Sequence, residues 1–297
     1  MNEKDPLQNI FPILKLPPLK YLDLIKSHQV SNNKKKNLKV KILTNITLSP
    51  LKEILELTLW NNKLDAEVTF GEYDNIIQES LLNNQNDCTI IFWELWNFFQ
   101  NAAPKLECMS KKDFKALQKK LKTDILLVIE SLKSEKLVLI NRFLNLPYSR
   151  YDGFQNRLNE LVDFGNKILE DCQNQNLRLI ETNQIHSMHS ISKTLDTRYL
   201  YSAKSIYSHI FYRHYACIVC MNILKIKGNI KKVLVLDCDN TLWKGVLGED
   251  GINGIDMSSD SPTGAVFNEV QLIFKSLKKK VFLSVFVQKI IMKILKQ

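Results

Sequence analysis

Short apolar runs alternate with longer segments of helical periodicity along most of the chain. Segments that predict strands lie at 38–43, 66–70, 136–141 and 177–181, and the run 88–93 predicts a buried strand. The segments between them predict helices over 50–60, 73–82, 111–133 and 155–171. Strands that alternate with helices in this way predict a parallel sheet with right-handed crossovers. Residues 37–183 are therefore expected to form one three-layer α/β domain.

Three further segments flank this domain. Residues 1–36 contain four prolines and end in a lysine run, which predicts an N-terminal arm and linker. Residues 184–229 are rich in aromatic side chains and mixed in pattern, which predicts a packed helical connector. A fresh apolar run at 231–236 begins a second α/β unit, so the last predicted segment is 230–297.

The composition is that of a globular protein. The 297 residues are 45% hydrophobic and 24% charged, which excludes wholesale disorder and allows about two domains. No run approaches the ~18 apolar residues of a membrane helix, so no membrane partner is expected. The N-terminal residues lack the pattern of a secretory signal, and the six cysteines are too irregularly spaced for a disulfide framework. The sequence therefore predicts a cytoplasmic protein.

The net charge of +10 suggests a nucleic-acid partner, but its distribution argues against one. Seven lysines and no acidic residue follow Glu269, so most of the excess charge lies in one short segment. Arginine, the residue best suited to bidentate phosphate and base recognition, occurs only six times. The sequence therefore predicts no nucleic-acid partner.

The strongest chemical signal stands directly after the apolar run 233–236. Asp237 and Asp239 are two residues apart and are followed by Asn240 and Thr241. Open α/β sheets bind ligands beyond the carboxyl ends of their strands, and two acids buried there without a cation would be costly. A hard cation resolves this cost, and Mg²⁺ suits carboxylates that work on phosphate. The alternative is an acidic turn that caps a helix.

The pattern Asp-x-Asp-x-Thr after an apolar strand resembles the first motif of the haloacid dehalogenase-like (HAD) superfamily. The continuation Trp-Lys-Gly-Val-Leu-Gly-Glu-Asp-Gly over 243–251 and Ser-Pro-Thr-Gly at 261–264 resemble the FkbH-like family, HAD subfamily IIIC. The resemblance covers about residues 37–280, and Lys244 departs from it where many members have a second glycine. It implies a flavodoxin-like and SGNH-hydrolase-like first domain, followed by an incomplete HAD-like domain.

This resemblance implies a role for each residue of the motif. Asp237 would be the nucleophile that attacks phosphorus to form an aspartyl-phosphate, and Asp239 would be the general acid/base. Asp237 and the backbone carbonyl of Asp239 would hold Mg²⁺, the implied cofactor. Thr241 and Asn240 would contact the phosphoryl group or its neighbouring loop.

The resemblance also implies a reaction and its partners. FkbH-like proteins load a glyceryl unit from 1,3-bisphosphoglycerate onto the thiol of an acyl carrier protein, with loss of phosphate, in polyketide and surface-polysaccharide pathways. The implied partners are therefore a phosphorylated three-carbon substrate and an acyl carrier protein. The rival hypothesis is a non-catalytic module, in which residues 37–227 recognise the carrier protein.

The first predicted domain carries no hydrolase motif. An SGNH hydrolase has Gly-Asp-Ser after its first strand, where this chain reads Leu-Thr-Asn-Ile-Thr over 43–47. His186 and His189 lie past the last predicted strand, without an Asp-x-x-His motif. Cys217 and Cys220 have the spacing of a metal-binding pair, but they stand alone in an apolar helical stretch, which favours buried structural cysteines.

The C-terminal residues are typical of a shifted reading frame. A HAD domain also needs a later Ser or Thr, a Lys and a late acidic pair, and only 56 residues follow Thr241. One choice of synonymous codons for 286–297, read two bases later, encodes Cys-Ser-Lys-Asn, which fits the family's second motif. The adenine-rich codons of Lys278–Lys280 are the expected slip site, and a divergent natural tail is the alternative. The sequence therefore predicts that 281–297 are out of frame and that this chain is inactive.

Overall fold

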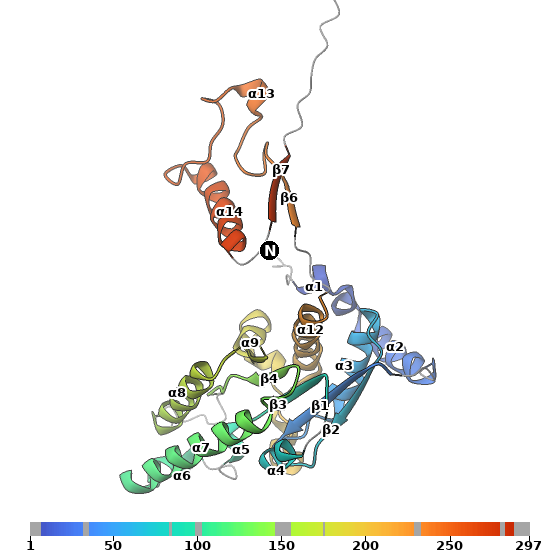
Figure 1. Cartoon of the computed structure of the whole chain (residues 1–297), viewed down its shortest axis with the longest axis vertical. Coiled ribbons are helices and arrows are strands. Elements are labelled where there is room, and N and C mark those ends of the chain that lie inside the picture. The colour runs from blue at the N-terminus through green and yellow to red at the C-terminus, as the bar shows by residue number, and fades with distance from the viewer. Residues whose placement is uncertain are drawn as a thin grey trace, which may run out of the picture. The chain divides into compact units, whose positions relative to one another are not determined.

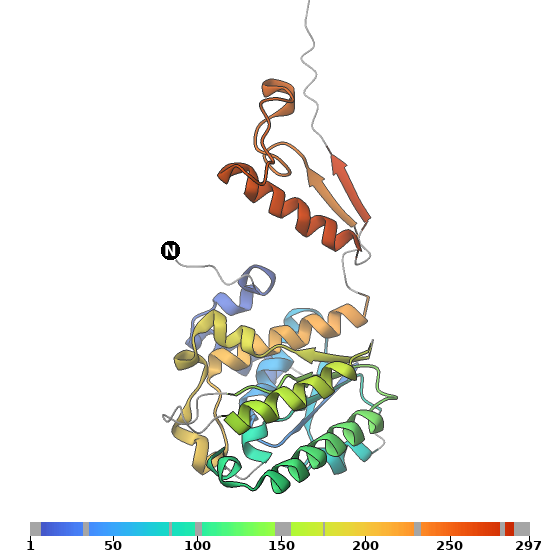
Figure 2. The same cartoon turned by 90° about the vertical axis from the view of Figure 1, so that its left-hand side faces the viewer.

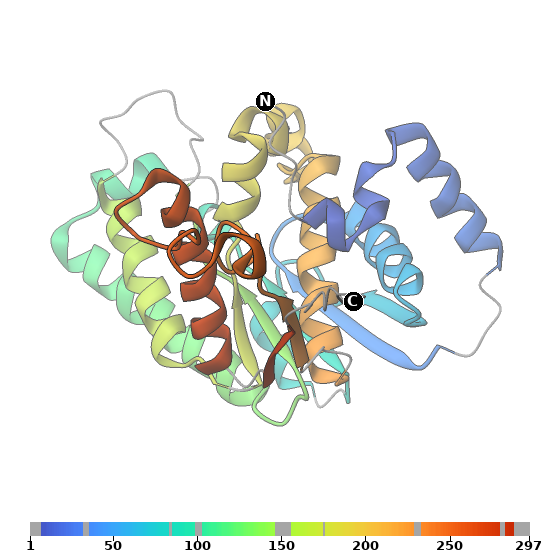
Figure 3. The same ribbon diagram turned by 90° about the horizontal axis from the view of Figure 1, so that it is seen from above.

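The computed structural model of the chain divides into two compact units, Met1–Lys227 and Gly228–Gln297. It describes residues 7–31, 36–82, 85–98, 103–145, 156–174, 176–228, 233–279 and 283–287. Figures 1, 2 and 3 show the elements of each unit from three directions. The division between the units lies next to the boundary that the sequence predicts between 229 and 230.

The first unit is built on a five-stranded parallel sheet. Its strands are β1 (Leu38–Thr44), β2 (Ala66–Phe70), β3 (Cys88–Phe92), β4 (Val138–Asn141) and β5 (Leu177–Ile180). Their order is β2-β1-β3-β4-β5, and every neighbouring pair is parallel. The predicted α/β class and parallel sheet are therefore confirmed. The direction of winding reverses between β1 and β3, the place where open sheets of this order bind ligands.

Helices connect and flank these strands. They are α1 (Leu7–Ile10), α2 (Pro18–Ser31), α3 (Ser49–Asn61), α4 (Ile76–Leu81), α5 (Leu95–Phe98), α6 (Ala103–Cys108), α7 (Lys111–Ser131), α8 (Asn156–Asp171), α9 (Asn183–His189), α10 (Ile191–Thr194), α11 (Leu200–Ala203) and α12 (His209–Ile226). Short 3₁₀ turns occupy Pro12–Lys15 and Thr197–Tyr199. In the part of the chain that the structure describes, no helix has the length and apolar character needed to cross a membrane.

The helices cover both faces of the sheet and give it three layers (Figure 2). Successive side chains of a strand point to opposite faces. Ile42 therefore lies in one buried cluster with residues of α2, α3 and α12, whereas Leu43 lies in a second cluster with residues of α7 and α8. The two faces of each buried strand thus contribute to separate halves of the core.

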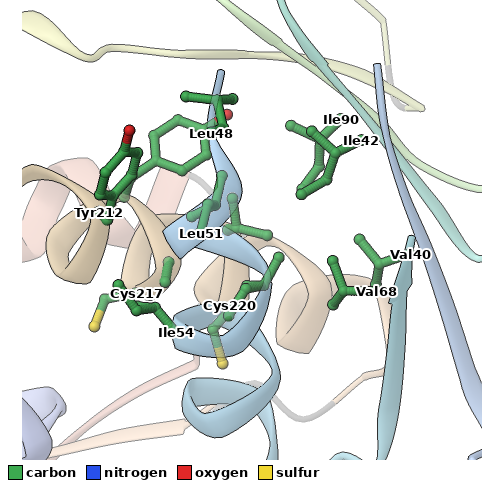
Figure 4. Close-up of a cluster of buried hydrophobic side chains, with 14 of the residues drawn as sticks. Val40, Ile42, Leu48, Leu51, Ile54, Val68, Ile90, Tyr212, Cys217 and Cys220 are labelled. Carbon is green, nitrogen blue, oxygen red and sulfur yellow. The ribbon is translucent and has the colours of Figure 1, made fainter. Parts of the chain in front are cut away.

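Figure 4 shows the first of these clusters, in which Cys217 and Cys220 of α12 lie among apolar side chains that include Leu51 and Ile54 of α3. Both cysteines are thiols outside any disulfide and are fully buried, and burial raises the pKa of Cys220 to about 12. The prediction that they are buried structural residues is confirmed.

Part of the predicted N-terminal arm packs into the same cluster. Tyr21 of α2 is only 1% exposed, and the guanidinium of Arg213 on α12 lies 4.2 Å from the centre of its ring. The same guanidinium donates hydrogen bonds to the backbone carbonyls of Ile13, Leu14 and Leu16, at 2.7, 3.0 and 3.1 Å. One arginine therefore fixes the N-terminal segment to the first unit.

The second unit is small in the residues that the structure describes. It contains β6 (Val233–Asp237), α13 (Leu247–Asp250), α14 (Pro262–Lys279) and β7 (Leu283–Val287), and β6 and β7 pair in parallel. Its buried cluster consists of Leu236, Cys238 and Leu242, with Trp243 and Phe274 packed against them. Of the segment that the sequence predicts to be out of frame, only 283–287 is described; 281–282 and 288–297 lie outside the described residues.

Candidate functional site

Asp237 is the last residue of β6, so its carboxylate lies at the carboxyl end of that strand. The residue is exposed, and its Oδ1 accepts a hydrogen bond from the backbone N–H of Cys238 at 2.8 Å. Cys238 itself is buried, and burial together with the two flanking aspartates raises the pKa of its thiol. At this strand end, the carboxylate is therefore accessible to solvent and the thiol is not.

Asp239 is half-buried and is held by the loop that follows it. Its Oδ1 accepts hydrogen bonds from the indole Nε1–H of Trp243 and from the backbone N–H of Leu247, both at 3.1 Å. These two donors come from both ends of one short loop segment, so they fix the carboxyl group in one orientation. A carboxyl group with a fixed orientation is what proton transfer to a leaving group requires.

Asn240 and Thr241 form the turn after the two aspartates. Asn240 has a φ of 53°, and its Oδ1 accepts the backbone N–H of Gly245 at 2.9 Å. Gly245 has a φ of 100°, a conformation that favours glycine. Thr241 is half-buried, and its backbone N–H donates to the carbonyl of Cys238 at 3.2 Å. The structure thus brings all four predicted site residues into one strand end and turn.

A second turn is attached to this loop. Lys244 and Asp256 exchange two backbone hydrogen bonds, at 2.8 and 3.0 Å. The Asp256 carboxylate accepts the hydroxyls of Ser261 and Thr263, and these bonds lower its pKa. A Cβ at Gly264 would lie 2.2 Å from Asp256 Oδ1, so only glycine fits the start of α14 at this position. The segment Ser-Pro-Thr-Gly at 261–264 therefore closes this turn.

Oxygen ligands are the ones that Mg²⁺ prefers, and the two aspartates after β6 match that preference. Asp237 offers an exposed carboxylate, and Asp239 offers a carboxylate and a backbone carbonyl in the turn. Within the described residues, no group of three or more His, Cys, Asp or Glu side chains meets at one point. The described residues therefore fit Mg²⁺ by their chemistry and supply two of its acidic neighbours, without a third.

Comparisons with known proteins show a likeness of fold. No family profile and no curated protein sequence matches this chain. Among solved structures, the N-terminal part of the protein BF1531 from Bacteroides fragilis is similar to it, with a TM-score of 0.74 at 19% sequence identity. That protein contains a phosphatase domain and is complexed with Mg, and the match covers 93% of this chain and 74% of that one. This likeness shows the fold.

Two esterase-type structures are less similar. The lipase Lip_vut3 from a goat rumen metagenome gives a TM-score of 0.42 at 14% identity, over 64% of this chain and 97% of that one. The acetyl xylan esterase Axe2 from Geobacillus stearothermophilus gives 0.40 at 12% identity, over 65% and 95%. Scores at this level have no bearing on the site.

A second polar cluster lies at the carboxyl edge of the five-stranded sheet. Asn45 follows β1, and its side chain bonds to both backbone groups of Glu94, which follows β3: Nδ2 donates to the carbonyl at 2.8 Å and Oδ1 accepts the N–H at 2.9 Å. Asn97 donates to the backbone carbonyl of Asn45 and, at 3.4 Å, to the hydroxyl of Tyr73. These bonds connect the segments that follow β1 and β3, the two strands between which the winding of the sheet reverses.

The carboxyl group of Glu94 points inside the protein. It accepts a hydrogen bond from the hydroxyl of Tyr207, and burial raises its pKa to about 7. His186 stacks on Tyr207, with ring centres 6.1 Å apart, and its Nδ1 lies 2.7 Å from Thr194 Oγ1. Burial lowers the pKa of His186 to about 4, so this imidazole is neutral at pH 7. The first unit therefore contains a partly protonated carboxyl group and a neutral histidine in its core.

Glu94 makes a specific prediction about stability and pH. Because its pKa is raised on folding from 4.5 to about 7, the stability it contributes is fully present below pH 4.5 and is lost as the pH rises through about 7. Glu94→Gln keeps an acceptor for Tyr207 and removes the titration. We expect the wild type to lose about 3 kcal/mol relative to this variant between pH 4.5 and pH 8.

Urea unfolding of both proteins at several pH values measures this difference. The contribution of His186 to the pH dependence of stability cancels in the comparison, because both proteins contain this residue. The matched control is Glu67→Gln, which removes an exposed glutamate from β2. If the free energy of unfolding depends on pH in the same way for Glu94→Gln and for the wild type, the prediction is contradicted.

Sequence reasoning did not identify Asp256 or Glu94. The signal for Asp256 was present, because hydroxyl residues stand five and seven positions downstream, where a turn brings them back to its carboxylate. Glu94 is an acidic residue two positions after a strand that ends in Ile-Ile-Phe, which also marks it. Its partner Tyr207 is 113 residues away, and no local pattern connects them.

Proposed function

We propose that the second unit carries the nucleophile of a HAD-like, Mg²⁺-dependent phosphoryl-transfer site. One observation carries the proposal: an exposed Asp237 stands at the carboxyl end of β6, two residues before an Asp239 that two N–H donors orient. The likeness of fold to a protein that contains a phosphatase domain supports it.

Each residue has a defined task in this reaction. An oxygen of Asp237 attacks phosphorus, and the new bond forms as the bond to the leaving oxygen breaks. Asp239 gives its proton to the leaving oxygen and then takes one from the water that hydrolyses the aspartyl-phosphate. Thr241 and Asn240 contact the phosphoryl group. Mg²⁺, when bound, offsets the negative charge on the phosphoryl oxygens.

At a finer level, we assign the chain to FkbH-like chemistry. The substrate would be 1,3-bisphosphoglycerate and the acceptor the thiol of an acyl carrier protein. The thiol would displace the acyl phosphate and water would hydrolyse the second phosphate ester, so the products would be a glyceryl thioester and two inorganic phosphates. The sequence over 243–251 and 261–264 supports this assignment, because these are the segments that resemble the FkbH-like family. The first unit would then recognise the carrier protein.

We expect the 297-residue chain to release phosphate slowly. The described residues supply Asp237 and Asp239 but no third acid beside them, and the loss of groups that act as a unit lowers rates by several orders of magnitude. We attribute the deficit to a shifted frame at Lys278–Lys280, because no acidic residue follows Glu269. DNA sequencing across that tract tests the attribution, and an uninterrupted frame would contradict it.

Phosphate release from p-nitrophenyl phosphate, measured with Mg²⁺ and with EDTA, tests the proposed function. We expect slow release that requires Mg²⁺ and that returns when excess Mg²⁺ is added after EDTA. Release that continues unchanged in EDTA would show that another group performs the hydrolysis.

The alternative function is a non-catalytic module that binds an acyl carrier protein. Among the described residues, no third His, Cys, Asp or Glu side chain joins Asp237 and Asp239, and an incomplete metal site favours this alternative. Calorimetric binding of a carrier protein, together with no Mg²⁺-dependent phosphate release, would favour the alternative. Phosphate release that Asp237→Asn abolishes would exclude it.

A further inference from the structure

Two histidines of the first unit meet through their Nε2 atoms. His189 is the last residue of α9, and His214 lies in the first half of α12. The two Nε2 atoms are 2.8 Å apart, and the ring centres are 4.0 Å apart at an angle of 57°. His214 is 5% exposed, whereas His189 is half-buried, so the pair lies at the edge of the core.

The hydrogen bonds define which nitrogen of His214 carries a lone pair. Its Nδ1 lies 2.9 Å from the backbone carbonyl of Ile210, and a carbonyl only accepts hydrogen bonds. Nδ1 of His214 therefore carries the hydrogen, and in the neutral ring Nε2 carries the lone pair, which is directed at His189. A carbonyl that holds Nδ1–H in this way is the usual second partner of a metal-binding histidine.

We propose that His189 and His214 form a binding site for a late first-row divalent transition metal ion, with Ni²⁺ as the best match. For metal–nitrogen bonds of about 2.1 Å, two ligands at a right angle lie about 3.0 Å apart, so the observed separation needs to open by only a few tenths of an ångström. His189 moves its hydrogen from Nε2 to Nδ1 through solvent, and both rings remain neutral. The metal then takes the place of the shared hydrogen.

The chemistry of the pair also restricts which ions it accepts. Imidazole suits Ni²⁺, Cu²⁺ and Zn²⁺, whereas Mg²⁺ prefers oxygen ligands. Among the residues that the structure describes, no third His, Cys, Asp or Glu side chain completes a cluster with this pair. The ion would join the end of α9 to α12, and a ligand that binds only the folded state raises its stability. This site is separate from the proposed Mg²⁺ site and does not depend on it.

The test is titration of Ni²⁺ into the full chain, without an affinity tag and in a Cys108→Ser background, because Cys108 is an exposed thiol. We expect one Ni²⁺ per chain by calorimetry and a higher midpoint of thermal unfolding with Ni²⁺. His189→Gln should weaken Ni²⁺ binding at least about tenfold, because it removes one of two protein ligands.

The matched control is His209→Gln, which removes an exposed histidine from the same helix and should leave Ni²⁺ affinity within about twofold. Equal affinities of the wild type and His189→Gln would overturn the proposal. Electron paramagnetic resonance of the Cu²⁺ complex of the unmutated chain needs no variant: splitting from two nitrogen ligands supports the site, and a spectrum without it overturns the proposal.

Discussion

Asp237→Asn is expected to abolish the phosphoenzyme. The chain is mixed for seconds with ³²P-labelled acetyl phosphate and Mg²⁺, quenched in acid and tested for label that hydroxylamine removes, which is the behaviour of an aspartyl-phosphate. An amide is not a nucleophile, so the label should fall by at least about 10³-fold. A single-turnover measurement of this kind detects the nucleophile even where sustained turnover is slow.

The geometry of the strand end indicates that this substitution removes the nucleophile and leaves the local structure unchanged. Asn at position 237 keeps an Oδ1 that accepts the N–H of Cys238, so the turn is retained. Asp260→Asn is the matched control, because it removes an exposed carboxylate from the same unit without touching the turn, and it should keep the label. Label that survives in Asp237→Asn would rule out Asp237 as the nucleophile.

Asp239→Asn should behave differently in the same experiment. Asn keeps the acceptor for Trp243 and Leu247 but has no proton to give to the leaving oxygen. Phosphoenzyme should then form about 10²–10⁴-fold more slowly from a substrate with a poor leaving group.

Phe211→Ala is expected to give the largest loss of stability. Phe211 is fully buried, stacks on Tyr207 with ring centres 3.9 Å apart, and has Tyr215 and Phe92 at 5.8 and 6.2 Å. Its removal leaves a cavity between rings that are held on different elements and so do not collapse to fill it. We expect the free energy of unfolding to fall by about 3–5 kcal/mol.

Urea or thermal unfolding, followed by circular dichroism, measures this loss. Tyr199→Ala is the control, because Tyr199 is 54% exposed and its truncation should change the free energy of unfolding by less than about 1 kcal/mol. A loss for Phe211→Ala no larger than that of Tyr199→Ala would mean that the aromatic cluster is not a packed part of the core.

The strands could be predicted because their signal is local. The run 66–70, in which apolar and polar residues alternate, is the observed β2, and the mostly apolar run 88–93 differs from β3 by one residue. The helix predicted over 73–82 is shorter in the structure, where α4 begins at Ile76. Asp74 explains the difference, because its φ of 56° is incompatible with a helix.

The two polar clusters, one at the end of β6 and one at the carboxyl edge of the five-stranded sheet, also differ in whether a local sequence signal reveals them. Asp237 and Asp239 are two residues apart in sequence at the end of one strand, so a short motif identifies them. Asn45 and Glu94 are 49 residues apart, and only the pairing of β1 with β3 brings them together. Each of these two residues is an ordinary polar position in its own segment, and its role depends on the completed sheet.

The bonds between Arg213 and the N-terminal segment also determine an order of events during synthesis. Their acceptors Ile13, Leu14 and Leu16 precede the arginine by 200, 199 and 197 residues. The ribosome therefore finishes almost the whole first unit before these three carbonyls have their donor and before the ring of Tyr21 has its guanidinium contact. Closing so long a loop is slow, so the N-terminal segment should be the last part of this unit to become protected from proteases.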